Sequence, residues 1–446
     1  MLLIYTIIYW ACVGLYYLKH NYIASVMMIS LAIFLFVSEI RKSKHLVTVR
    51  GLFALGFIGG FGLSLLKLSR LSADYSLMTF VVVFVSYFSL YLGVVLRDKG
   101  AKNNSDQFNY DRRITNKLFT NQQLLVVILL IVTFLAFIIE AMMLGFVPLF
   151  TKDTPHAYST FHVFMLHYIT TFYAFIPCIA IANYFENKAE RLDIILIIIS
   201  FVYLMIMSLF MVSRSQLILS LALSILIVII YKIKNVYEFR ISKFGILKLI
   251  TFAIIFIALY GIITIYRAHN IEYLNGIFEM KNENTPIFIT QPYMYVAHNF
   301  ENLNYMINNI FRFTCGRRML YPLFTLTFIK KLFPIVVDSP YYIIKQELST
   351  VTLVYDAYYD FGIIGVICFC FIIGYIGKML EDKAYAIVNN IYNNKNNYIV
   401  ILFAQYSYFM IFSFFQTYFS LTDTWVHIIF IYLLFKFIVM NKKEGA

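Results

Sequence analysis

Few charged side chains interrupt this very apolar sequence, and those that do are the first candidates for chemistry. The run 194–230 contains a single charged residue, Arg214, between Ser213 and Ser215. An arginine at the centre of a bilayer costs about 2.5 to 3.5 kcal/mol on insertion scales. Two spans of about 18 residues each would fill the run, so we expect a turn at Arg214 that faces the outer membrane surface. The alternative is an arginine that snorkels to the interface and only anchors the helix.

Three more arginines follow on the same predicted side of the membrane. Arg267 stands where a predicted helix leaves the bilayer, and Arg317 and Arg318 follow Gly316. Guanidinium groups bind phosphate and pyrophosphate through planar, paired hydrogen bonds. We therefore predict that these three arginines bind phosphate or pyrophosphate together with Arg214. For Arg267 the alternative is an ordinary basic residue at a helix end.

Histidines on this side are candidates for acid–base chemistry. A neutral imidazole near pH 7 can accept a proton from a sugar hydroxyl. His269 and His298 lie in a long segment predicted to be external, 267–360, and we predict them as catalytic. A lone histidine in a loop is more often structural, which is the alternative for each. The other histidines near a loop on this side are His156, His162 and His167.

Two carboxylates stand four residues apart in the stretch TLVYDAYYDFGIIGV, at Asp356 and Asp360. In a helix both would share one face, where like charges cost energy unless an arginine or a shared proton compensates them. We predict both as catalytic. An acid near a helix N-terminus is also favourable as a cap, and this alternative explains Asp360 but not Asp356, one turn earlier.

The elements that position these residues are membrane helices. The 446 residues are 61% hydrophobic and 13% charged, with a mean hydropathy of +0.77, which exceeds the needs of a soluble core. We predict an all-α polytopic membrane protein with about 12 transmembrane helices. The expected spans are 2–18, 22–38, 51–66, 76–96, 121–144, 166–185, 194–212, 215–231, 249–266, 361–380, 398–416 and 425–440. The first span has no cleavage pattern and is expected to be retained.

The net charge is +13, and the basic residues are distributed as the predicted topology requires. Alternate loops and the C-terminal tail hold most of the 36 lysines and arginines. The positive-inside rule makes these segments cytoplasmic and predicts both termini inside. The basic balance then reflects topology and contact with membrane lipid headgroups, and we predict no nucleic-acid partner.

Several enzyme signatures are missing from the sequence. It contains no Walker-type glycine loop, no His-Glu-x-x-His, no Gly-x-Ser-x-Gly and no Asp-x-Asp pair. This disfavours an ATP-driven pump and a nucleotide-dependent transferase. The five cysteines have neither disulfide nor zinc spacing, and we predict no metal and no cofactor.

The long segment 267–360 divides the chain into transmembrane helices 1–266, this external loop, and transmembrane helices 361–446. The loop holds five of the eight prolines and is too long for a mere connector. NFENLNYMINNIFRF predicts an amphipathic helix, and LYPLFTLTFIKKLFPIVV would suit a helix in the interface. The alternative is a small lid with its own core. Either arrangement covers the external membrane face.

Three stretches resemble the oligosaccharide repeat unit polymerases, the Wzy type of O-antigen and capsule assembly. VSRSQLILSLALSIL is similar to the family's Ser-Arg step, and QPYMYVAHNFENLNYMI to the start of its large loop. STVTLVYDAYYDFGIIGVICFCFIIGYIGKM is similar to its Asp-Phe-Gly entry into the next helix. Their order and the layout of spans also agree, so the resemblance covers nearly the whole chain.

The resemblance implies a metal-independent, inverting glycosyltransferase with a GT-C-like fold in the bacterial cytoplasmic membrane. Its substrates are undecaprenyl-pyrophosphate-linked glycans, and its partners are membrane lipid, a chain-length regulator and a flippase. Arg214 matches the family's Ser-Arg position and Asp360 its Asp-Phe-Gly position. Arg267 and Arg317 rest on the charge argument alone.

The reaction also needs a base and a surface for the sugars. His269, His298, Asp356 and Glu301 remain open as the general base. We predict that Glu301, Tyr293 and Tyr355, which lie in the resembling stretches, bind glycan.

Two other functions stay open. A related O-antigen ligase would share the chemistry, and a lipid-linked oligosaccharide flippase or other transporter would share the number of spans. A transporter is expected to have short external loops and charges at its midplane. The long loop 267–360 and the scarcity of charge inside the spans favour the polymerase.

Overall fold

A computed structural model describes residues 2–101, 121–151, 157–186, 191–233, 271–329, 342–389 and 398–441. Within these ranges every regular element is a helix, and the single β-type contact is a bridge between Ser69 and Met280. This confirms the predicted all-α class. Seven helices in the described ranges are long and apolar enough to cross a membrane, so the chain is a multi-pass membrane protein.

The helices follow the predicted spans closely. The seven candidate spans are Asn21–Ser43, Leu77–Asp98, Gln122–Leu144, Leu166–Glu186, Arg191–Phe210, Arg214–Lys232 and Tyr355–Asn389. Shorter apolar helices occupy Leu2–Tyr17, Val49–Ser64 and Tyr398–Ile411. The predicted span 249–266 lies outside the described residues, and a total of 12 spans stays a prediction.

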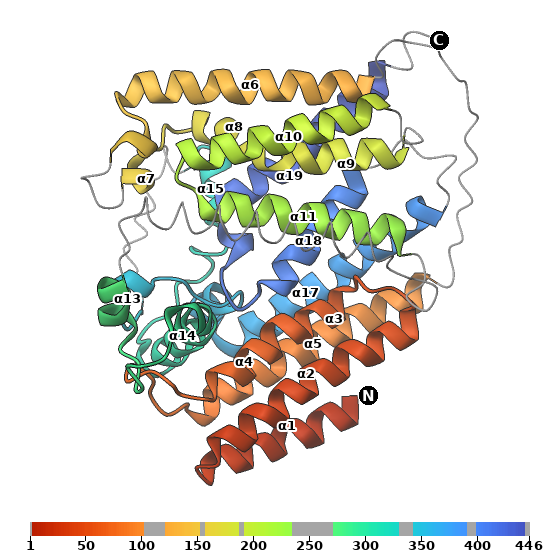
Figure 1. Cartoon of the computed structure of the whole chain (residues 1–446). Coiled ribbons are helices and arrows are strands. Elements are labelled where there is room, and N and C mark those ends of the chain that lie inside the picture. Colours follow the sequence, from red (N-terminus) through yellow and green to blue (C-terminus); the bar gives the residue numbers. More distant parts are fainter. Residues whose placement is uncertain are drawn as a thin grey trace. The chain divides into compact units, whose positions relative to one another are not determined.

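The chain forms two compact units, each built from separate stretches of sequence (Figure 1). Unit 1 contains Met1–Gln107, Ile271–Asp382 and Phe409–Trp425. Unit 2 contains Phe108–Asn270, Lys383–Tyr408 and Val426–Ala446. The described part of the predicted external loop therefore belongs to unit 1, where it packs with helices from the N-terminal quarter of the chain.

Unit 1 begins with a cluster of N-terminal helices. Its elements are α1 (Leu2–Tyr17), α2 (Asn21–Ser43), α3 (Val49–Phe53), the π-helical turn η1 (Ala54–Ile58), α4 (Gly59–Ser64), α5 (Leu77–Ala101), α13 (Ile271–Phe278), α14 (Ile287–Asn309), α15 (Tyr321–Leu326), η5 (Gln346–Leu348), the first part of α17 (Tyr355–Asn389) and η6 (Tyr418–Ser420). Helix α2 contacts α1, α3, η1 and α4.

Helices α5 and α17 approach closely because each carries a glycine at the contact. A Cβ atom on Gly93 would lie 2.1 Å from the carbonyl oxygen of Phe371. A Cβ atom on Gly374 would lie 2.3 Å from the carbonyl oxygen of Leu90.

Helix α14 is the amphipathic helix that the sequence predicted in the long loop, although it begins earlier than the pattern indicated. Phe300, Leu303 and Met306 are fully buried, and the ring of Phe300 lies 5.5 Å from that of Phe57. The helix ends before Phe311, which is 94% exposed. In Figure 1, α14 is seen almost along its axis while α2 and α5 run across the view, so α14 crosses them steeply.

Unit 2 is a bundle of helices that run side by side (Figure 1). Its elements are α6 (Asn121–Leu144), η2 (Pro148–Phe150), α7 (Ala157–Thr160), α8 (Leu166–Thr171), η3 (Phe172–Phe175), α9 (Ile176–Glu186), α10 (Arg191–Phe210), α11 (Arg214–Lys232) and parts of α18 (Tyr398–Ile411) and α19 (Thr422–Asn441). Helix α10 ends at Phe210 and α11 begins at Arg214, which confirms the predicted turn in the run 194–230.

Candidate functional site

The turn 313–320 packs on the first residues of α17 in unit 1. Helix α17 contains a break at Gly362, whose φ of 61° and ψ of −148° favour glycine. The ring of Phe313 sits against this break, 2.9 Å from where a Cβ of Gly362 would stand. The backbone N–H groups of Thr314 and Cys315 donate to the carbonyls of Tyr359 and Asp360. Two stretches about 40 residues apart are thereby joined at the predicted Asp-Phe-Gly motif.

Asp360 holds the turn through its carboxylate. Its Oδ2 accepts from the backbone N–H of Met319 at 2.8 Å, and Oδ1 accepts from that of Arg318 at 3.3 Å. The Thr314 hydroxyl also donates to Oδ1. Asp360 is fully buried, and its carboxylate is satisfied by the turn. The capping alternative is therefore wrong for Asp360, because the N–H groups that it accepts from belong to the turn and α17 begins five residues earlier, at Tyr355.

Asp356 forms a buried ion pair with Arg318. The Nε of Arg318 lies 2.5 Å from Oδ1 of Asp356, and the two side chains are 4% and 5% exposed. The guanidinium carbon also stands 4.7 Å from the ring centroid of Tyr359. The guanidinium of Arg318 compensates Asp356, while Asp360 is compensated by the N–H groups and the hydroxyl of the turn. Helix α17 begins at Tyr355, earlier than the expected 361, so Asp356 lies in its first turn.

The two adjacent arginines of the turn have opposite environments. Arg318 is buried and its charge is matched by Asp356. Arg317 and Arg312 are exposed, and no ion pair of either occurs among the described residues. Around them lie exposed apolar side chains, including Leu320 and Leu323. Arg317 is therefore the arginine of this turn that is available to an anion at an apolar surface.

Glu301 pairs with a lysine that sequence reasoning did not single out. Lys67 Nζ lies 2.6 Å from Oε1 of Glu301, and both side chains are buried. The Tyr75 hydroxyl donates to the same oxygen at 3.0 Å, and the backbone N–H of Ala73 donates to Oε2 at 3.2 Å. Burial raises the pKa of the Glu301 carboxyl and lowers the pKa of Lys67 to about 8, while the attraction within the pair opposes both shifts. The pair ties the segment between α4 and α5 to α14.

The two predicted glycan-binding tyrosines are also engaged within unit 1. The Tyr293 hydroxyl accepts from the backbone N–H of Leu68 at 2.9 Å. The Tyr355 hydroxyl donates to the Tyr342 carbonyl at 3.1 Å and accepts from its N–H at 3.0 Å. Both side chains are buried. Glycan binding by these tyrosines and by Glu301 stays a prediction, and their observed contacts hold the scaffold.

His298 lies on the buried face of α14. It is 2% exposed, and its Nε2 has no hydrogen-bond partner among the described residues. Burial lowers the pKa of His298 to about 4, and the nearby ammonium of Lys345 contributes to this shift. The imidazole is therefore neutral at pH 7, as a general base must be. Among the described residues, however, no carboxylate accepts a hydrogen bond from His298 and orients its ring. Its catalytic role stays a prediction.

Arg214 belongs to unit 2, and the turn 313–320 belongs to unit 1. It is the first residue of α11 and is only 5% exposed, and anchoring of the helix stays the alternative to anion binding. The preceding Ser213 caps the helix by accepting from the backbone N–H of Gln216 at 3.4 Å. The remaining predicted residues, Arg267 and His269, lie outside the described residues.

A second charged network lies at the other end of the helices of unit 1. Arg50 pairs with Glu39 between α3 and α2, and Lys378 of α17 pairs with Glu381 at 2.7 Å. Glu381 in turn accepts from the backbone N–H of Val49 at 2.9 Å. The expected spans 22–38 and 51–66 leave 39–50 as a loop, but α2 continues to Ser43 and α3 begins at Val49. This network fastens α2, α3 and α17 together.

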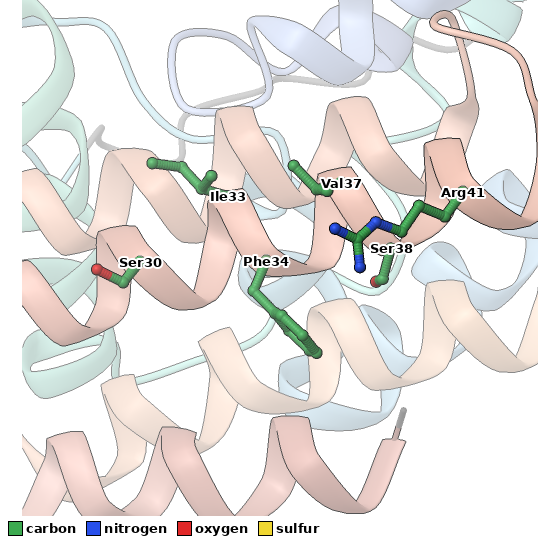
Figure 2. Close-up of a pocket in the computed structure, with 6 residues that line it drawn as sticks. All are labelled: Ser30, Ile33, Phe34, Val37, Ser38 and Arg41. Carbon is green, nitrogen blue, oxygen red and sulfur yellow. The ribbon is translucent and has the colours of Figure 1, made fainter. Parts of the chain in front are cut away.

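A groove on the surface of α2 carries little chemistry. Figure 2 shows Ile33, Phe34 and Val37 along one stripe of the helix, with Arg41 turned back towards Ser38. The sixth lining residue is Ser30. The stripe contains neither an acid–base pair nor a nucleophile next to a base, and we assign it no part in the site.

The described residues contain no group of three or more histidine, cysteine, aspartate or glutamate side chains that could hold a metal ion. Among them, the strongest constellation of the predicted site residues is the turn 313–320 with Asp356 and Asp360. Comparison with known proteins adds nothing to this, because no family model, no curated protein and no solved structure matches the sequence.

Proposed function

We propose that the chain is a glycosyltransferase that joins undecaprenyl-pyrophosphate-linked oligosaccharide units into a polysaccharide at the outer face of a bacterial cytoplasmic membrane. A hydroxyl of one lipid-linked unit attacks the anomeric carbon of the glycan on another. The bond to pyrophosphate breaks, and the lipid pyrophosphate leaves with its electron pair. The product is an O-antigen or a capsular polysaccharide.

One observation carries this proposal: the turn with Arg317 and Arg318 packs against Asp356 and Asp360. The charge argument and the family resemblance singled out these two stretches separately. Their packing fits a site in which the buried pair sets the turn and the exposed Arg317 meets the leaving pyrophosphate. Preorganised guanidinium groups stabilise the charge that develops on such a leaving group. The multi-pass helical fold fits a lipid-linked substrate.

The test is elongation by purified protein. The probe is the lipid-linked repeat unit extracted from host cells that lack this chain. A ladder of longer lipid-linked chains supports the proposal. Transfer to a lipid A core acceptor without a ladder would indicate the ligase, and movement across vesicles without elongation would indicate the flippase.

Arginine variants connect the assay to the site. We expect Arg214→Ala and Arg317→Ala to abolish the ladder while the protein remains in the membrane. Arg70→Ala is the matched control, because Arg70 is 59% exposed and pairs with the exposed Glu283 at 2.8 Å. Full activity in Arg214→Ala would return that arginine to an anchoring role.

A further inference from the structure

Glu140 is a carboxylate inside a membrane helix and takes no part in the cluster around Asp356 and Asp360. It lies on α6, four residues before the helix ends at Leu144, and its side chain is fully buried. Ionisable groups in membrane helices are expensive and often mark sites of function. The position therefore requires a partner or a role.

The partner of Glu140 is His167, next to the start of α8. The Oε1 of Glu140 lies 2.9 Å from Nδ1 of His167, and it accepts from the backbone N–H of Val163 at 2.9 Å. The other oxygen, Oε2, is buried and has no hydrogen-bond partner among the described residues. One hydrogen bond from a backbone N–H group thus fixes the carboxylate, and one imidazole lies against it. Its Oε2 can accept a hydrogen bond from a further donor.

This geometry determines which nitrogen of His167 can act. A carboxylate at Nδ1 favours the tautomer in which Nδ1 carries the hydrogen, so Nε2 keeps its lone pair. His167 is 16% exposed, unlike the buried Glu140. The ring of the exposed His162 lies 4.9 Å from the ring of His167. A carboxylate that orients a partly accessible imidazole is the arrangement that general bases use.

The same end of unit 2 carries Arg214. The ring of Phe210, the last residue of α10, stacks 5.8 Å from that of Phe137 on α6. Helix α11 begins just after this point, at Arg214. Since Glu140 follows Phe137 by one turn of α6, the predicted pyrophosphate-binding arginine and the Glu140–His167 pair share one end of unit 2.

We propose that His167, oriented by Glu140, is the base that accepts the proton of the attacking hydroxyl. This inference rests on the proposed function. The hydroxyl proton moves to Nε2 of His167 while the oxygen bonds to the anomeric carbon and the pyrophosphate leaves with the electron pair of the broken bond. The imidazolium then gives its proton to water. His167 is a catalytic residue in this scheme, and Glu140 is a positioning residue.

The described competitors for this role fit less well. His298 is buried and lacks a carboxylate partner. Asp356 is paired with Arg318, and Glu301 is paired with Lys67. The remaining explanation is that Glu140 and His167 merely fasten the segment before α8 to α6, and the experiment must separate the two.

The experiment measures elongation with the extracted lipid-linked repeat unit, for wild type, His167→Ala, Glu140→Gln and the control His162→Ala. We expect kcat of His167→Ala to fall about 10²- to 10⁴-fold with KM little changed, and added imidazole to restore part of it. Glu140→Gln keeps an oxygen for Val163 but loses the charge, so its kcat falls less, again without a change in KM. His162→Ala keeps the wild-type rate.

The outcomes distinguish the inference from the proposed function. A wild type that makes no ladder overturns the proposed function and this inference with it. A wild type that elongates while His167→Ala elongates equally fast, or is slow without rescue by imidazole, overturns the inference alone. If His167→Ala does not fold, Glu140→Gln decides, and an unchanged kcat in that variant overturns the inference.

Discussion

Both units of the molecule contain buried carboxylates, and those in the two candidate sites are satisfied to different degrees. In unit 1 Asp360 accepts three hydrogen bonds and Asp356 pairs with a buried arginine. In unit 2 Glu140 faces a histidine and one backbone N–H, and its second oxygen has no partner among the described residues.

The difference separates groups that build the site from groups that are free to react. A buried charge whose hydrogen bonds are complete contributes to the fold. Its removal leaves the partner charge buried and unpaired, which destabilises the protein. A carboxylate that orients a partly exposed imidazole leaves a lone pair for chemistry. We therefore expect variants of Asp356 and Asp360 to lose stability, and variants of Glu140 and His167 to lose activity while the fold persists.

The largest stability effect is expected from Asp356→Ala. This change leaves the guanidinium of Arg318 buried without its carboxylate, and breaking such a pair costs about 3 to 5 kcal/mol. The free energy of unfolding in mixed micelles measures the loss. The double variant Arg318→Met with Asp356→Leu should recover most of it, because neither charge remains.

The exposed pair of Arg70 and Glu283 supplies the control for this prediction. Both side chains are more than half exposed, and such pairs contribute about 0 to 1 kcal/mol. Glu283→Ala should therefore change the free energy of unfolding by less than about 1 kcal/mol. A loss in Asp356→Ala as small as in Glu283→Ala would contradict the structural role of the buried pair.

His298 provides a second way to sharpen the comparison, because it is a histidine without a carboxylate. Its folded-state pKa of about 4 lies below the ordinary 6.5, so the unfolded chain binds the proton more readily between these values. The contribution of the neutral, buried imidazole to the free energy of unfolding is fully present above pH 6.5. It is lost as the pH falls from 6.5 through 4, and the total loss is about 3 kcal/mol. His298→Leu should remove this part of the acid sensitivity. Equal acid sensitivity in wild type and variant would contradict the burial of the imidazole.

The fold was largely predictable because membrane helices need long apolar runs. The predicted span 121–144 coincides with α6 and the span 215–231 with α11 to within a residue. The predictions were poorest where the backbone leaves a straight helix. Apolar composition does not show the π-helical turn η1 at Ala54–Ile58 or the break at Gly362, since both depend on tertiary contacts.

The site was predictable only in part, because sequence patterns show charges but not their partners. The spacing of Asp356 and Asp360 correctly indicated one shared face that needs an arginine. It did not indicate Lys67 as the partner of Glu301, since 234 residues separate them. Glu140 is a lone acid in the expected span 121–144, which marks it as a candidate, but the sequence does not show that its partner is His167.

A smaller loss is expected from Asp360→Asn. The amide keeps one oxygen for the turn but loses the charge and one of the acceptors for the N–H groups of Arg318 and Met319. Hydrogen bonds to charged groups contribute about 1.5 to 3 kcal/mol, and we expect a loss of unfolding free energy in that range. The control is Asp74→Asn, whose partner Lys19 is 72% exposed, with an expected change below 1 kcal/mol.

The smallest stability effect is expected from His167→Ala, and it bears most directly on the comparison. The imidazole is partly exposed and faces Glu140, which keeps its hydrogen bond from Val163 when the ring is removed. Water can then reach the carboxylate through the space that the ring occupied, so we expect a loss below about 1 kcal/mol. A loss as large as in Asp356→Ala would mean that both carboxylates build the fold. A small loss together with a large fall in elongation would show that the Glu140–His167 pair serves the chemistry, whereas Asp356 and Asp360 serve the fold.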